Sequence, residues 1–186
     1  GHFKVSASRR PNDAAAHYNL GTALTQAGLF DDAVAAYEQA LRLRPRYARA
    51  LSNLADTLVV LGRTDEALTR YEAAVRADPL MPEAHNNLGA ALWRKGDLLR
   101  AERELNEALR LRPGYAEAYF NRGHTAVKDG RLVDAAGHFR LAASLKPDWD
   151  MITYLHGAGR DHADKWLAVA RSAVGRLETI DLAKYF

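Results

Sequence analysis

The sequence predicts an all-α protein built from repeated helix pairs, and two observations predict it. Prolines, glycines and alanines recur at fixed positions with a spacing of 34 residues. Between them, apolar residues follow the three- and four-residue spacing of amphipathic helices. The fixed positions are Pro45, Pro79, Pro113 and Pro147; Gly28, Gly62, Gly96 and Gly130; Ala33, Ala67, Ala101 and Ala135; and Ala40, Ala74, Ala108 and Ala142.

Each unit is expected to hold two helices around a tight turn. In the first unit, Gly28 suits the left-handed conformation that ends a helix, and Asp31 is the expected N-cap of the next one. Pro45 then ends the second helix, because proline lacks the N–H and clashes with the preceding turn. Helices of about 14 residues are marginal alone in water, so stacking on neighbours must stabilise them. The period divides the chain into units at 14–47, 48–81, 82–115 and 116–149.

Small and large residues alternate in a way that predicts close packing of helices. Small residues on the first helices are expected to let the alanines of the second helices approach closely. Large residues on the second helices are expected to fill the space between successive units. The small positions are Gly21, Ala55, Gly89 and Gly123, and the large ones are Tyr37, Tyr71, Leu105 and Phe139.

These residues resemble the 34-residue pattern of the tetratricopeptide repeat family. The resemblance covers residues 14–149, and only Arg122 and Ala126 depart from the positions compared. It implies a right-handed superhelical solenoid of antiparallel helix pairs.

Both ends of the chain continue the pattern in part. Phe3 and Pro11 lie 34 residues before Tyr37 and Pro45, so residues 1–13 are expected to be the end of a truncated preceding repeat, with an extended leader as the alternative. Residues 150–186 are expected to form a partial fifth repeat and a C-terminal capping helix through about Leu177. The capping helix would present one apolar face to the last repeat.

The sequence argues against catalysis, cofactors and metals. It has no phosphate-binding loop, no GxGxxG and no GxSxG. His156, Asp161, His162 and Asp164 lie close together, but their spacing matches no established metal motif, so helix caps and solvated side chains are favoured. The net charge of +3 is mild, and the basic runs near Pro45 and Pro113 are favoured as complements of helix dipoles over nucleic-acid contacts.

Binding of a protein or peptide partner is the favoured function. Stacked helix pairs are expected to leave a concave groove lined by the first helices. The sixth position of every unit is asparagine, whose side chain can pair with both the N–H and the C=O of a peptide backbone. This row resembles the repeat arm of O-linked N-acetylglucosamine transferases, while family consensus is the alternative explanation. The asparagines are Asn19, Asn53, Asn87 and Asn121.

Neighbouring positions are expected to set the specificity of that groove, or else to be ordinary solvated residues. The chain is therefore predicted to be a non-enzymatic interaction scaffold or adaptor. The alternative is a substrate-recruiting arm of a larger enzyme, such as a glycosyltransferase, whose catalytic domain lies outside this sequence. Self-association through the terminal faces is a further hypothesis. The further groove candidates are Tyr18, Thr22, Asp56, Trp93, Arg94, Phe120, His124 and Lys128.

No run of about 18 apolar residues occurs, so no membrane span is expected. A cytoplasmic location is favoured.

Overall fold

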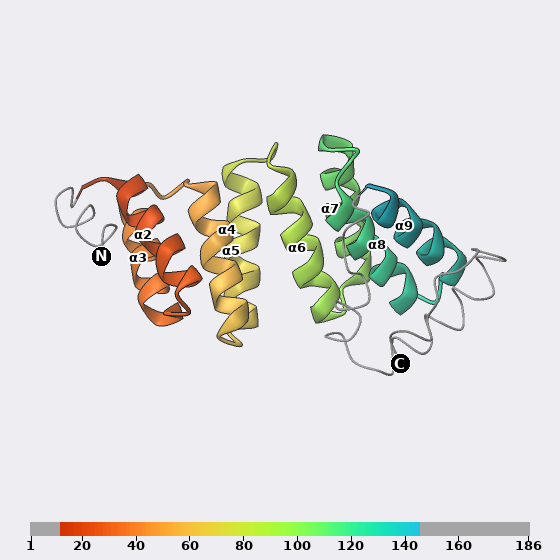
Figure 1. Cartoon of the computed structure of the whole chain (residues 1–186), viewed down its shortest axis with the longest axis horizontal. Helices are drawn as coiled ribbons and strands as arrows, with labels where there is room; N and C mark the ends of the chain where they lie inside the picture. The colour runs from red at the N-terminus through yellow and green to blue at the C-terminus, as the bar shows by residue number, and fades with distance from the viewer. Residues whose placement is uncertain (1–11, 146–186) are drawn as a thin grey trace. The chain divides into compact units, whose positions relative to one another are not determined.

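The computed structural model describes residues 12–145, and these form eight α-helices with no strand among them (Figure 1). The helices are 13 or 14 residues long, as the repeat period predicts. The expected preceding repeat, fifth repeat, capping helix and His156 cluster lie outside the described residues, apart from residues 12 and 13. The helices are α2 (Ala14–Gln26), α3 (Phe30–Leu43), α4 (Ala48–Val60), α5 (Thr64–Ala77), α6 (Pro82–Lys95), α7 (Leu98–Leu111), α8 (Ala116–Lys128) and α9 (Leu132–Leu145).

The chain divides into two compact units. Unit 1 (Gly1–Pro113) contains α2 to α7, and unit 2 (Gly114–Phe186) contains α8 and α9. The helices pack in pairs, α2 with α3, α4 with α5, α6 with α7 and α8 with α9. Within unit 1, α3 also packs on α4 and α5 on α6, so the three pairs share a core. The fold is an all-α helical repeat solenoid.

The turns between paired helices follow the glycine prediction. Gly28, Gly62, Gly96 and Gly130 have φ values of 74°, 75°, 90° and 77°, in the left-handed region that favours glycine. The second helices α3, α5 and α7 end two residues before Pro45, Pro79 and Pro113, as predicted.

The prediction that Asp31 caps the second helix is wrong. Helix α3 begins at Phe30, its N-cap is Leu29, and no side chain bonds to the free N–H groups there. Asp31 lies inside the first turn instead, where its negative charge complements the helix dipole. Side chains do cap two other helices: Asp13 accepts from two backbone N–H groups of α2, and Asp97 accepts from the N–H of Arg100 in α7.

The small residues of the first helices lie under the large residues of the second helices of the same repeat. A Cβ added at Gly21 would come within 2.6 Å of the Tyr37 ring, and one at Gly89 within 2.7 Å of Leu105. These large residues thus cover the glycine of their own pair, and Tyr37 and Tyr71 also belong to the core cluster that extends across successive repeats. Tyr37 and Leu105 are almost fully buried there.

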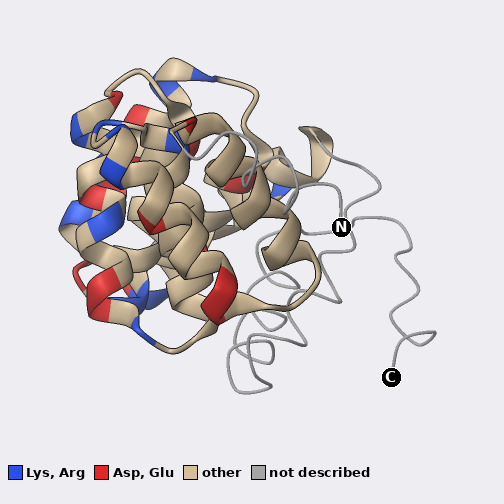
Figure 2. Ribbon diagram, turned by 90° about the vertical axis from the view of Figure 1, so that its left-hand side faces the viewer, with Lys and Arg blue, Asp and Glu red and all other residues tan. Residues whose placement is uncertain are grey.

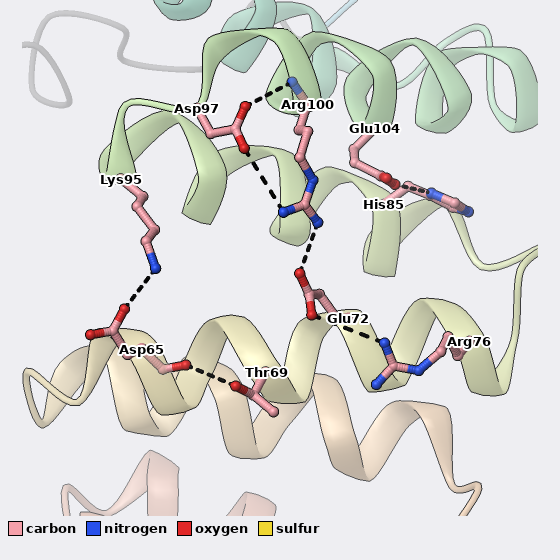
Figure 3. Close-up of polar contacts among 9 residues, drawn as sticks. All are labelled: Asp65, Thr69, Glu72, Arg76, His85, Lys95, Asp97, Arg100 and Glu104. Carbon is pink, nitrogen blue, oxygen red and sulfur yellow. Dashed lines mark hydrogen bonds and ion pairs between the residues drawn. The ribbon is translucent and has the colours of Figure 1, made fainter.

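The second and third repeats are also joined by polar contacts, which Figure 3 shows. Lys95 donates to Asp65 at 2.9 Å, and Arg100 donates to Glu72 at 2.8 Å. These exposed ion pairs each contribute about 0–1 kcal/mol. The buried His85 side chain bonds to Glu104 of α7, and this contact stays within the third repeat.

Unit 2 has its own small core around Phe120 and Phe139, whose rings pack edge to face at 5.4 Å. The two departures from the repeat pattern, Arg122 and Ala126, both lie in α8. Arg122 Nε is buried and has no hydrogen-bond partner within the described part of the chain. Both departures from the repeat pattern thus lie in the fourth repeat, which belongs to unit 2, whereas the first three repeats belong to unit 1.

Candidate functional site

The first helices of unit 1, α2, α4 and α6, present a row of mainly polar side chains, and hydrogen bonds link some of them from one repeat to the next. We call this row the first-helix face. Its members are Tyr18, Asn19 and Thr22 of α2, Ser52, Asn53, Asp56 and Val60 of α4, and Asn87, Trp93 and Arg94 of α6.

Tyr18 and Asn53 join the first repeat to the second. Asn53 Nδ2 donates to the Tyr18 hydroxyl at 3.2 Å. The Tyr18 ring lies 6.1 Å from the Tyr37 ring and 5.1 Å from the Tyr47 ring, between centroids, so the aromatic cluster fixes its position. The Arg44 guanidinium lies over the Tyr47 ring at 4.8 Å. A rigid hydroxyl therefore stands at the α2–α4 junction.

Asn87 joins the second repeat to the third. Its Nδ2 donates to Ser52 Oγ and to Asp56 Oδ1, both at 3.3 Å, and its Oδ1 accepts from Asn86 Nδ2 at 3.2 Å. An amide nitrogen has two hydrogens, so the Asn87 donors are fully used inside the protein.

Asp56 is held from two directions. Its Oδ1 accepts from the Tyr71 hydroxyl of α5 at 2.5 Å as well as from Asn87. Part of the Asp56 side chain reaches solvent, but its carboxylate lies among packed helices. The loss of hydration there raises the pKa of Asp56, while the hydrogen bond from Tyr71 and the charge of Arg94 act to lower it. Desolvation and the adjacent Asp56 raise the pKa of Tyr71 in turn, which keeps the phenol protonated as a donor.

The four predicted asparagines are therefore not equivalent. Asn19 is exposed and its side chain makes no hydrogen bond among the described residues. Asn53 uses one donor, and Asn87 uses both donors and one acceptor position. Asn121 belongs to unit 2 and is half-buried. The expectation that each asparagine offers both donors and acceptors to a ligand is corrected for Asn87.

Two of the predicted residues in unit 2 lie in its core. Phe120 is 1% exposed and packs against Phe139, and the buried His124 ring lies 4.5 Å from the Phe120 ring. Both rings pack on the Phe139 ring of α9, so neither presents its face to a ligand, and the expectation that they line the groove is corrected. Lys128 is exposed at the end of α8.

Sequence reasoning missed Ser52 and assigned Tyr71 only to packing. Tyr71 is 3% exposed, as a core residue should be, but its hydroxyl also positions Asp56. The sequence does contain a signal for the second role of Tyr71. At this position of the repeat, Tyr37 and Tyr71 have a hydroxyl, whereas Leu105 and Phe139 have none. The Tyr37 hydroxyl likewise donates to Thr22 at 3.3 Å.

Charge is unevenly distributed between the two kinds of helix in unit 1. Helix α2 has no acidic or basic residue apart from His17, and α4 has only Arg49 and Asp56. The second helices α3, α5 and α7 are rich in both signs, and Figure 2 shows acidic and basic residues interspersed. The first-helix face is thus mainly neutral and polar.

Residues 12–145 contain no group of three or more side chains suited to a metal ion. None of the described helices is long and apolar enough to cross a membrane.

The fold and this polar face define a helical-repeat scaffold of the kind that serves protein interactions. The chain belongs to the tetratricopeptide repeat family: models of that repeat match residues 14–47, 52–105 and 91–148. Proteins of this family are generally non-catalytic scaffolds. No match was found among curated protein sequences.

Solved structures show the same architecture. YrrB, a TPR protein with an unusual peptide-binding site, is 24% identical, with coverage of 100% of this chain and 99% of its own and a TM-score of 0.69. MamA (residue 41 to its end) from Desulfovibrio magneticus RS-1 is 27% identical, with coverage of 80% and 84% and a TM-score of 0.68. A chain of the APC/C hetero-tetramer Cut9–Hcn1 is 19% identical, with coverage of 78% and 28% and a TM-score of 0.72.

Proposed function

We propose that unit 1 binds an extended peptide segment of a partner protein along the first-helix face, and that the protein acts as an interaction scaffold or adaptor. The observation that carries this proposal is the row of polar side chains at matching positions of α2, α4 and α6. An extended peptide offers N–H and C=O groups along its length, so a row of amides and hydroxyls is suited to its backbone.

The charge distribution supports the same face. Several charged side chains of the second helices α5 and α7 are already paired within the protein, and those of all the second helices are mostly well solvated. The first-helix face combines neutral polar groups with Val60, an exposed aliphatic residue, and the half-buried Trp93. Aromatic anchors among neutral polar groups are typical of binding surfaces. The peptide-binding site of YrrB supports the view that this fold can serve such a role.

The first test is selection of linear peptides from a phage-displayed random library on the immobilised protein. Binding of the selected peptides is then measured for the wild type, Asn19→Arg, Val60→Arg and the control Leu99→Arg. Val60 and Leu99 are matched because they are 60% and 65% exposed, on a first and a second helix respectively. We expect the Asn19 and Val60 variants to lose binding and the Leu99 variant to retain it.

The proposal is refuted if no peptide is enriched, or if the peptides bind Val60→Arg as well as the wild type but fail on Leu99→Arg. The same face would serve a free-standing adaptor and a substrate-recruiting arm of a larger enzyme, so the assay does not depend on which of the two the protein is.

A further inference from the structure

The first-helix face has acceptor atoms left over where its donors are already used. Asn87 Nδ2 donates both hydrogens inside the protein, and Asn53 Nδ2 donates one. Asn53 Oδ1 and Asp56 Oδ2 accept no hydrogen bond from the described residues. Since these two residues are three apart on α4, their side chains share one face of the helix. A ligand at this point is best matched if it brings donors.

From this we infer that the peptide bound by unit 1 carries a lysine or arginine side chain whose cationic head pairs with Asp56. The inference rests on the proposed function and specifies the chemistry of its ligand. Lysine brings three N–H donors and arginine five, and neither has an acceptor.

The carboxylate is held in place before the ligand arrives. The Tyr71 hydroxyl and Asn87 Nδ2 both donate to Oδ1, and Tyr71 is itself fixed in the core. The second oxygen is thereby left for an external donor. A side chain that is already immobilised loses little conformational entropy on binding, which favours affinity.

Asp56 is also the unpaired acid of these helices. The other acidic residue on α2, α4 and α6 is Glu83, which forms an ion pair with Arg112. Arg94 lies near enough for its charge to act on Asp56, but no ion pair joins the two among the described contacts. The carboxylate therefore remains available to a ligand cation, and Arg94 would favour a ligand whose positive charge is compact rather than spread over several residues.

An apolar surface for the stem of the ligand side chain lies one turn further along α4. Val60 is four residues after Asp56, so it stands on the same face, and it is 60% exposed. Lysine and arginine side chains lay their methylene groups on apolar surface and keep the charged head at its end. Val60 would therefore contact the methylene groups of the ligand side chain, and Asp56 would pair with its charged head.

The test uses the peptides selected on the wild-type protein. Each is synthesised with its basic residue and again with methionine in that place, and dissociation constants are measured by fluorescence polarisation. On the wild type we expect the basic form to bind about tenfold more tightly or better, as a charge-assisted hydrogen bond implies. On Asp56→Asn, which keeps an oxygen for Tyr71, we expect the two forms to bind within about twofold of each other.

Asp65→Asn is the matched control, because Asp65 carries the same charge on the second helix α5. It should preserve the full preference for the basic peptide. Circular dichroism melts confirm that each variant is folded. If Asp56→Asn does not fold, the wild type alone decides, because raised salt should weaken the basic peptide and leave the methionine peptide unchanged.

Selected peptides without a required basic residue, a preference for acidic residues, or a basic preference that survives in Asp56→Asn each overturn this inference and leave peptide binding standing. Enrichment of no peptide at all overturns the proposed function, and this inference with it.

Discussion

His85 and Glu104 connect the two helices of the third repeat, and replacing Glu104 by glutamine should make the stability of the protein less dependent on pH. His85 Nδ1 lies 2.7 Å from Glu104 Oε2, and His85 Nε2 lies 3.0 Å from the Pro79 carbonyl oxygen (the Glu104 contact is drawn in Figure 3). Both ring nitrogens thus face an oxygen acceptor. Only the doubly protonated imidazolium donates to both, with the carboxylate of Glu104 as its counter-charge.

The direction follows from the pKa of His85. The hydrogen bond to Glu104 raises this pKa above its ordinary value of 6.5, against the lowering effect of burial, and the Pro79 carbonyl adds to the rise. The folded protein therefore binds this proton more tightly than the unfolded chain does. The resulting stabilisation is complete below the unfolded pKa and is lost as the pH rises through the folded pKa.

The expected size comes from the kind of hydrogen bond that is lost. A bond to a charged partner contributes about 1.5–3 kcal/mol and a neutral one about 0.5–1.5 kcal/mol, and glutamine can still accept from Nδ1–H. Glu104→Gln should therefore cost about 1–2 kcal/mol at low pH, where His85 is charged in the wild type. When His85 is neutral, the glutamine amide can donate to Nδ1, so the difference between the two proteins should fall towards zero.

The assay is urea unfolding of the wild type and the variant at about pH 5.5 and about pH 9, on either side of the expected titration. Glu72→Gln is the control, because Glu72 pairs with Arg100 and Arg76 rather than with a histidine. Its effect should be small and constant. Equal effects of Glu104→Gln at both pH values, or a His85 pKa at or below 6.5 by NMR, would refute the reasoning.

Two further predictions concern glycine. Gly89→Ala should destabilise the protein by about 1–3 kcal/mol, because the new Cβ would meet Leu105 at 2.7 Å. Gly137→Ala is the control, because no atom lies within 4 Å of the added Cβ on helix α9, and it should be neutral or stabilise by up to about 1 kcal/mol. Thermal melts compare the two variants directly. Gly62→Ala should cost about 1–2 kcal/mol although nothing lies within 4 Å, because its φ of +75° strains any residue with a Cβ; urea unfolding without loss of stability would contradict this.

The fold was accessible from the sequence because its determinants are local and periodic. Gly28 and its equivalents mark the turns, and Pro45 and its equivalents lie just beyond the helix ends, so the helices of residues 14–145 could be placed from the residue pattern alone. The cap at Asp31 could not be placed, since an acidic residue near a helix start serves either as the cap or within the first turn. The two positions differ by a backbone conformation that the residue type does not determine.

The binding candidates were predicted less completely, because a repeat pattern gives the face of a residue but not its partners. Asn53 and Asp56 lie on the first-helix face, whereas Phe120 and His124 lie in the core of unit 2. A large aromatic ring at a nominally open position can turn inward where another ring is there to pack against, and Phe120 and His124 both pack on Phe139 of α9. That choice depends on packing across the helix pair, which the pattern does not encode.

The asparagine row has a regularity that separates its structural role from its binding role. The bonds from Asn53 to Tyr18 and from Asn87 to Ser52 both span 35 residues, so each amide donates to a hydroxyl one position earlier in the preceding repeat. The nitrogen atoms of Asn53 and Asn87 therefore hold neighbouring repeats together, whereas the proposed ligand would meet the oxygen atom of Asn53. Replacing asparagine by alanine removes both roles at once. Tyr18→Phe removes only the Asn53 partner, and we expect it to lower the free energy of unfolding by about 0.5–1.5 kcal/mol. Urea unfolding measures this change. An unchanged free energy of unfolding would contradict a structural role for the bond between Asn53 and Tyr18.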